Sequence, residues 1–137
     1  AAAQVGTFAP LLECEVTKEE VRELAALFGL PNWANPSGAC LSSRFPYGQK
    51  ITREGLDRVA AAEEFLRGLG FTQIRVRHHE GLLARIEVLP SELPRFLENG
   101  LHERVHDELR RIGFTYVTLD LRGYRTGSMN EAIGRTV

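Results

Sequence analysis

The sequence predicts an α+β fold for residues 51–137, in which helices cover one face of a short mixed or antiparallel sheet. Apolar residues recur at helical spacing in segments 52–69 and 101–112, and a glycine follows each segment. Runs of alternating residues predict three strands, at 71–77, 82–88 and 114–121. The expected order is therefore helix, strand, strand, helix, strand.

A pattern of helix, glycine and strand occurs twice in this region. Residues 66–76 match residues 109–119 in overall pattern, since each is the end of a helix, a glycine and a strand. Two copies are too few for a solenoid, so they indicate two similar corners within one small domain.

The first fifty residues are predicted to form a separate part of the chain. Residues 17–20, Thr-Lys-Glu-Glu, are a capping box that starts a helix, and Gly29 ends it. Residues 5–13 suggest a strand and a loop. Because no initiator methionine is present, we expect the chain to begin at a cut. From residue 31 to 50 the sequence is rich in Asn, Pro, Ser and Gly without periodicity, which predicts a long functional loop.

Composition excludes several classes of function. Hydrophobic residues make up 43% of the 137 residues, and the formal net charge is −1. No basic excess favours nucleic acid or an anionic membrane, and the start lacks the features of a signal peptide. Two cysteines without a C-x-x-C pair suit a reducing compartment, so we expect a cytoplasmic protein.

The motif H-E-x-x-H occurs at His102, Glu103 and His106. On a helix it places two imidazoles on one face for zinc, with the glutamate as a base. No third ligand follows at the usual spacing, and charged residues stand where a buried metalloprotease helix needs apolar ones. A metallohydrolase is therefore the least favoured interpretation.

Basic residues share one face of the predicted strand 71–77, where Gln73, Arg75 and Arg77 alternate. A three-residue hairpin loop at 79–81 predicts the register of the next strand: Arg77 opposite Leu83, Arg75 opposite Arg85, and Gln73 opposite Glu87. Like charges facing each other destabilise a strand pair, so three guanidinium groups here call for an anion such as phosphate. The alternative is an exposed face neutralised by Glu80 and Glu87.

Cys40 lies in the non-periodic loop, with Arg44 four residues later. A nearby cation lowers the pKa of a thiol and favours the nucleophilic thiolate. The alternative is a buried structural cysteine, which is the more common role of an isolated cysteine.

Several segments together resemble a known family. Residues 10–13, 17–25 and 29–31 resemble the segment that closes the nucleotide domain of PP-loop ATP pyrophosphatases. The continuation resembles the sacrificial sulfur transferases of nickel-pincer cofactor synthesis, in the lactate racemase maturation pathway. The residues that carry this resemblance are Trp33, Pro36-Ser37, Ala39 to Arg44, Pro46 to Gly48, Arg75 to Arg77, Ala84 to Val88, Asp120-Leu121 and Gly123 to Glu131.

The resemblance implies a reaction and a set of site residues. In that family ATP, with Mg²⁺, adenylylates a carboxylate of a pyridinium mononucleotide, and a cysteine then gives up its sulfur and becomes dehydroalanine. It implies that Cys40 is the donor and that a phosphate or the substrate is bound by Ser43, Arg44, Arg75 and Arg77. Its candidate acidic residues are Glu63, Glu64, Glu87 and Asp120, with the metal and its ligands left open.

The resemblance also implies what surrounds this chain. The family's phosphate loop, S-G-G-x-D-S, does not occur here, so residues 1–50 are interpreted as the tail of a PP-loop nucleotide domain with the donor loop, and 51–137 as the C-terminal domain. The chain alone is expected to be inactive, and a homo-oligomer, by resemblance a hexamer, is expected. The alternative is a non-catalytic substrate-binding or oligomerisation module, because a fold does not determine a function.

Overall fold

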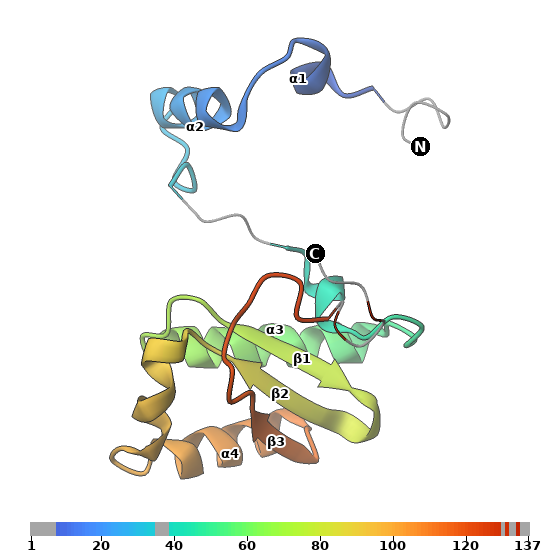
Figure 1. The fold of residues 1–137 in the computed structure, drawn as a ribbon, viewed down its shortest axis with the longest axis vertical. Helices are drawn as coiled ribbons and strands as arrows, with labels where there is room; N and C mark the ends of the chain where they lie inside the picture. The colour runs from blue at the N-terminus through green and yellow to red at the C-terminus, as the bar shows by residue number, and fades with distance from the viewer. Residues whose placement is uncertain (1–7, 35–38, 130, 132–133, 135–137) are drawn as a thin grey trace. The chain divides into compact units, whose positions relative to one another are not determined.

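A computed structural model describes residues 8–34, 39–129, 131 and 134. The chain forms two compact units, Ala1–Ala39 and Cys40–Val137 (Figure 1). The domain boundary predicted at residues 50/51 stays a prediction. Among the described residues, no helix is long and apolar enough to cross a membrane.

The first unit contains two helices, α1 (Pro10–Glu13) and α2 (Lys18–Leu27). The predicted capping box is confirmed, since the Thr17 hydroxyl accepts the Glu20 amide at 3.3 Å and the Glu20 carboxylate accepts the Thr17 amide at 2.7 Å. The strand suggested at residues 5–13 is wrong over 10–13. Pro10 stands at the start of α1, where its fixed φ favours a helix. Residues 5–7 lie outside the described part.

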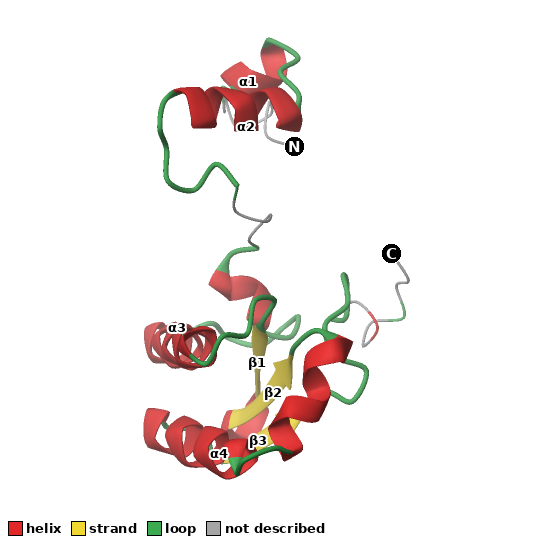
Figure 2. Cartoon of the chain, turned by 90° about the vertical axis from the view of Figure 1, so that its left-hand side faces the viewer, coloured by secondary structure: helices red, strands yellow, loops and turns green. Residues whose placement is uncertain are grey.

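The second unit has the predicted α+β architecture. After the short 3₁₀ helix η2 (Leu41–Arg44) come, in order, α3 (Arg53–Gly68), β1 (Arg75–His79), η3 (Glu80–Leu82), β2 (Leu83–Glu87), η4 (Pro90–Leu97), α4 (Leu101–Ile112) and β3 (Tyr116–Leu119). The strands form one mixed sheet in the order β1-β2-β3, with β1 antiparallel and β3 parallel to β2. Helices α3 and α4 lie on one face of this sheet (Figure 2). Thr52 caps α3 by accepting the Gly55 amide, as the sequence predicted.

The repeated pattern of helix, glycine and strand is confirmed as two equivalent corners. Gly70 and Gly113 have left-handed φ angles of 84° and 112°. At each corner the amide of the following phenylalanine donates to the carbonyl five residues earlier, so Phe71 bonds to Leu66 and Phe114 to Leu109. Both phenylalanines are buried between the helices and the sheet, where they form part of the core.

The hairpin register differs from the prediction by two positions. Arg75 pairs with Glu87, Arg77 with Arg85, and His79 with Leu83. The loop is residues 80–82 instead of 79–81, because both Gly81 and Leu82 take left-handed φ angles, 69° and 57°. Because the loop is shifted by one residue along the chain, each residue of β1 pairs with a β2 residue two positions later than predicted.

The other face of the sheet is crossed by residues 120–129, which we call the C-terminal strap (Figure 1). Its path is set where the Tyr124 amide donates to the Val88 carbonyl at 2.6 Å. Gly123 precedes that contact with φ 68°, and a Cβ atom there would lie 2.6 Å from the Val88 oxygen. Only glycine allows this close approach.

Candidate functional site

Cys40 begins a tight turn that positions its thiol. It precedes η2, and its side chain is exposed. The Cys40 Sγ lies 2.7 Å from the Ser42 hydroxyl oxygen. The hydrogen bond to Ser42, followed by the Ser43 amide, lowers the pKa of the Cys40 thiol. A lowered pKa favours the thiolate, which is the nucleophilic form.

Arg44 anchors this turn to the interior. The predicted effect of its charge on the pKa of the thiol stays a prediction. Its guanidinium donates to both carboxylate oxygens of Glu63 in α3, at 2.7 and 3.0 Å, and the two side chains are only 4% and 5% exposed. Arg44 also donates to the Cys40 carbonyl at 3.0 Å, and Glu63 accepts the Val76 amide at 3.1 Å. The pair therefore ties the turn at residues 40–44, which we call the Cys40 turn, to α3 and to β1. Glu64 lies on the exposed side of the same helix.

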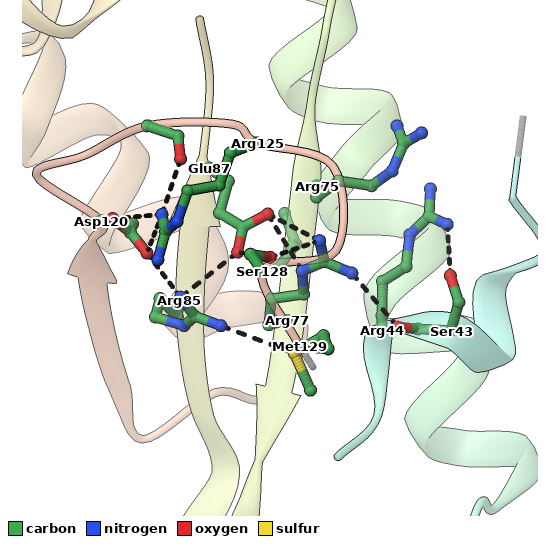
Figure 3. Close-up of polar contacts among 12 residues, drawn as sticks. Ser43, Arg44, Arg75, Arg77, Arg85, Glu87, Asp120, Arg125, Ser128 and Met129 are labelled. Atoms are coloured by element: carbon green, nitrogen blue, oxygen red, sulfur yellow. Dashed lines mark hydrogen bonds and ion pairs between the residues drawn. The ribbon is translucent and has the colours of Figure 1, made fainter. Parts of the chain in front are cut away.

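Arg77 and Glu87 form a second buried ion pair on the strap side of the sheet (Figure 3). Arg77 donates from Nε and Nη2 to one Glu87 oxygen at 3.0 and 2.7 Å. Its Nη2 also donates to the Ser128 hydroxyl at 2.9 Å, and its Nη1 donates to the Ser43 carbonyl at 3.1 Å. Every nitrogen of the Arg77 guanidinium is thus engaged within the protein.

The network continues along the strap through alternating charges. Arg85 lies between the carboxylates of Glu87, at 3.2 Å, and Asp120, which it also contacts. Arg125 donates to both Asp120 oxygens at 3.2 Å and to Glu131 at 2.6 and 2.8 Å. The Arg85–Asp120 ion pair therefore fastens the strap to β2.

Arg75 is the arginine of this face that pairs with no carboxylate among the described residues. It is partly buried, donates to the Ile74 carbonyl at 2.6 Å, and its Cζ lies 5.2 Å from the centre of the Tyr124 ring. Figure 3 shows its guanidinium pointing away from Glu87. Burial lowers the pKa of Arg75, and the charge of Arg44 lowers it further. A cation in this position favours a bound anion.

Three of the four predicted acidic residues pair with arginines in this arrangement. Glu63, Glu87 and Asp120 each accept from at least one arginine. Across residues 8–34 and 39–129, with 131 and 134, no three His, Cys, Asp or Glu side chains form a metal-binding group. His102 and His106 of the H-E-x-x-H motif lie on the exposed side of α4.

The structure brings most of the predicted residues into one region. Ser43, Arg44 and Glu63 hold the Cys40 turn, and Arg77 links that turn to Glu87. Asp120 joins the network through Arg85. Residues 35–38 of the predicted loop lie outside the described part. Sequence reasoning assigned no role to three polar residues of the network, Ser42, Arg125 and Ser128. It placed Arg85 on this face, but opposite Arg75 instead of Arg77.

These features define a class of protein: a small α+β domain that carries an activated, exposed cysteine beside an arginine-rich sheet face closed by a strap. No family model matches the chain. It is 45% identical over 133 residues to an uncharacterized protein of Synechocystis sp., covering 97% of this chain and 49% of that protein. It is 42% identical over 133 residues to the pyridinium-3,5-bisthiocarboxylic acid mononucleotide synthase of Lactiplantibacillus plantarum, covering 97% of this chain and 47% of the synthase.

A third relative is more distant. The chain is 28% identical over 117 residues to an uncharacterized protein of Methanocaldococcus jannaschii, covering 85% of this chain and 44% of that protein. The chain thus spans about half the length of each of these relatives. The similarity to the Lactiplantibacillus synthase agrees with the resemblance drawn from the sequence.

Proposed function

We propose that this chain is part of an ATP-dependent sulfur transferase in which Cys40 donates its sulfur to a pyridinium carboxylate mononucleotide. The observation that carries the proposal is the exposed Cys40 thiol, whose pKa is lowered by the Ser42 hydroxyl. The 42% identity with the mononucleotide synthase over 97% of the chain supports the class of substrate. ATP and Mg²⁺ belong to the intact protein in this proposal, and no step is assigned to a metal at Glu63, Glu87 or Asp120.

The chemistry assigned to the chain begins with the Cys40 thiolate. It attacks a carboxyl group of the substrate that has been activated as an acyl adenylate, and AMP leaves as the thioester forms. A base then removes the Cys40 Cα proton, and the Cβ–S bond breaks. Its electron pair stays with sulfur as the thiocarboxylate, while residue 40 becomes dehydroalanine. The Ser42 contact serves the first step because it favours the thiolate.

The phosphate of the nucleotide substrate is assigned first to Arg75. Its guanidinium has donors to offer, since among the described groups it donates only to the Ile74 carbonyl. Arginine forks match phosphate oxygens, and a half-buried fork loses less strength to water than an exposed one. Arg77 is assigned the task of holding the sheet face and the Cys40 turn, because all three of its nitrogens already bind protein groups.

The test uses the intact enzyme with ATP, Mg²⁺ and the carboxylated mononucleotide. Each chain is expected to react once, to lose the mass of one H₂S, and to carry dehydroalanine at position 40 in peptide mapping. Cys40→Ser is expected to abolish sulfur transfer while pyrophosphate release continues, because activation of the carboxylate does not need the thiol. Cys14→Ser is the matched control, since Cys14 is also an exposed free cysteine. Repeated turnovers with an unchanged mass at Cys40 and no added sulfur source would contradict the proposal.

A companion measurement addresses the phosphate loop that the sequence lacks. Pyrophosphate release from ATP is expected from the intact enzyme and not from this chain alone. Backbone amides of such a loop supply an anion-binding nest that side chains rarely replace. ATP-dependent pyrophosphate release by the isolated chain would refute the assignment of ATP binding to the remainder of the protein.

A further inference from the structure

The C-terminal strap meets the sheet face at Ser128. This residue is buried, with 4% of its surface exposed. Its hydroxyl donates to Oε1 of Glu87 at 2.8 Å and accepts from Nη2 of Arg77 at 2.9 Å. One hydroxyl group therefore bridges both members of the buried ion pair (Figure 3).

The same arginine reaches the Cys40 turn. Nη1 of Arg77 donates to the Ser43 carbonyl at 3.1 Å, and the Ser43 hydroxyl donates to the Cys40 carbonyl at 2.8 Å. A continuous series of hydrogen bonds thus runs from the strap to the main chain of Cys40. The thiol itself hydrogen-bonds Ser42, within the turn that this series holds.

Competition for Glu87 explains why the hydroxyl matters. Arg77 and Arg85 stand opposite each other in the sheet register, and both contact the Glu87 carboxylate. Ser128 occupies Oε1, the oxygen that also faces Arg85 at 3.2 Å. Without the hydroxyl, that oxygen would be left with Arg85 alone. The Glu87 carboxylate would then turn towards Arg85, which would weaken its ion pair with Arg77. The Arg77 guanidinium would no longer be held in line with the Ser43 carbonyl.

We propose that Ser128 is a positioning residue for the Cys40 turn, which holds Arg77 on the Ser43 carbonyl and so keeps the Cys40 thiol in its reactive geometry. The proposal deepens the proposed function and rests on it in one respect, namely that Cys40 is the sulfur donor. The part played by the strap in this arrangement does not depend on ATP or on the substrate.

The experiment measures alkylation of Cys40 by iodoacetamide in the 137-residue chain, by peptide mass spectrometry between pH 6 and 9. Cys14 in the same sample is the internal reference. Ser128→Ala is expected to raise the pH midpoint for Cys40 and to lower its rate at pH 7 relative to Cys14 by about fivefold, the ratio that one ordinary hydrogen bond contributes. Ser42→Ala removes the contact to the thiol directly and is expected to shift the midpoint in the same direction.

Two variants separate positioning from general stability. Ser128→Thr keeps the hydroxyl and is expected to retain the wild-type midpoint. Thr118→Val removes a hydroxyl that donates to the Ala84 carbonyl at 2.9 Å in the same sheet and takes no part in the series of hydrogen bonds from Ser128 to Cys40. This variant is expected to leave the pH midpoint of Cys40 alkylation unchanged even if it lowers the melting temperature. If Ser128→Ala does not fold, Arg125→Gln loosens the strap at its ion pairs with Asp120 and Glu131 and replaces it in the comparison.

An unchanged Cys40 midpoint in the folded strap variant, together with a lowered melting temperature, would overturn the positioning role and leave Ser128 as a stabilising contact only. The proposed function fails by a different result, the absence of dehydroalanine in the intact wild-type enzyme. The two failures are distinguishable because alkylation requires neither ATP nor substrate.

Discussion

Replacing Glu63 by glutamine tests whether the Arg44–Glu63 pair holds the Cys40 turn. The change keeps the shape of the side chain but removes its charge, which leaves the Arg44 guanidinium buried without a counter-ion. Both side chains are at most 5% exposed, and two hydrogen bonds of 2.7 and 3.0 Å join them. Breaking a buried pair of this kind costs about 3–5 kcal/mol of the free energy of unfolding. For a domain of this size, that lowers the melting temperature by roughly 15–30 °C.

The assay is urea unfolding of the chain followed by far-ultraviolet circular dichroism. Asp57→Asn is the matched control, an acid-to-amide change in the same helix that breaks the exposed pair with Arg53, where the side chains are 85% and 64% exposed. It is expected to cost less than about 0.5 kcal/mol. Replacing the buried pair jointly, Arg44→Met with Glu63→Leu, is expected to recover most of the loss, because apolar residues need no counter-ion. A cost for Glu63→Gln equal to that of the control would refute the anchoring role.

Three further predictions concern Gly123 in the strap, the buried His78, and Arg75. Gly123→Ala is expected to destabilise the domain by about 2–3 kcal/mol in urea unfolding, because alanine disfavours the left-handed φ and its Cβ would clash with the main chain. Gly81→Ala is the control: Gly81 has nearly the same φ but open space around it, so this change measures the cost of the left-handed φ alone, about 1 kcal/mol. Burial lowers the pKa of His78, so the unfolded chain binds more protons and stability falls as pH drops below about 6.5. In unfolding at pH 7 and pH 5, His78→Phe is expected to reduce that loss without abolishing it, since the pKa of His79 is lowered too; an unchanged loss would contradict this origin. Arg75→Gln in the intact enzyme is expected to weaken nucleotide-substrate binding by about tenfold in calorimetry, the worth of one charge-assisted hydrogen bond, and equal affinity would argue against a phosphate site there.

The elements of the fold could be predicted from the sequence because their signals are local. The capping box at Thr17, the cap at Thr52 and the left-handed glycines at 70 and 113 act within a few residues of the helix ends they define. The strand order and the parallel pairing of β3 with β2 are long-range properties that no local pattern encodes. The predicted hairpin register was wrong because two left-handed residues in succession, Gly81 and Leu82, shift the loop by one residue from the position that glycine alone indicated.

The site was predictable in its residue types but not in its pairings. Sequence reasoning treated Arg44 and Arg77 as groups open to phosphate, whereas the structure buries both and pairs them with Glu63 and Glu87. Which cation meets which carboxylate depends on how α3, the sheet and the strap come together. The role of Ser128 depends on the same assembly, because the residue lies in a glycine- and serine-rich tail with no periodic signal.

The way in which the Cys40 turn is held has a consequence for the protein after its reaction. Arg44 and the Ser43 hydroxyl donate hydrogen bonds to the main-chain carbonyl of residue 40, and Arg77 donates to the carbonyl of residue 43. The contacts described for the sulfur are local ones, to Ser42 and to the Ser43 amide, and the Cys40 side chain is exposed. Under the proposed chemistry, a used chain would therefore keep the shape of a fresh one. It would still bind the nucleotide, and without a separate means of removal, used protein would accumulate as a competitor of the unused enzyme for its own substrate.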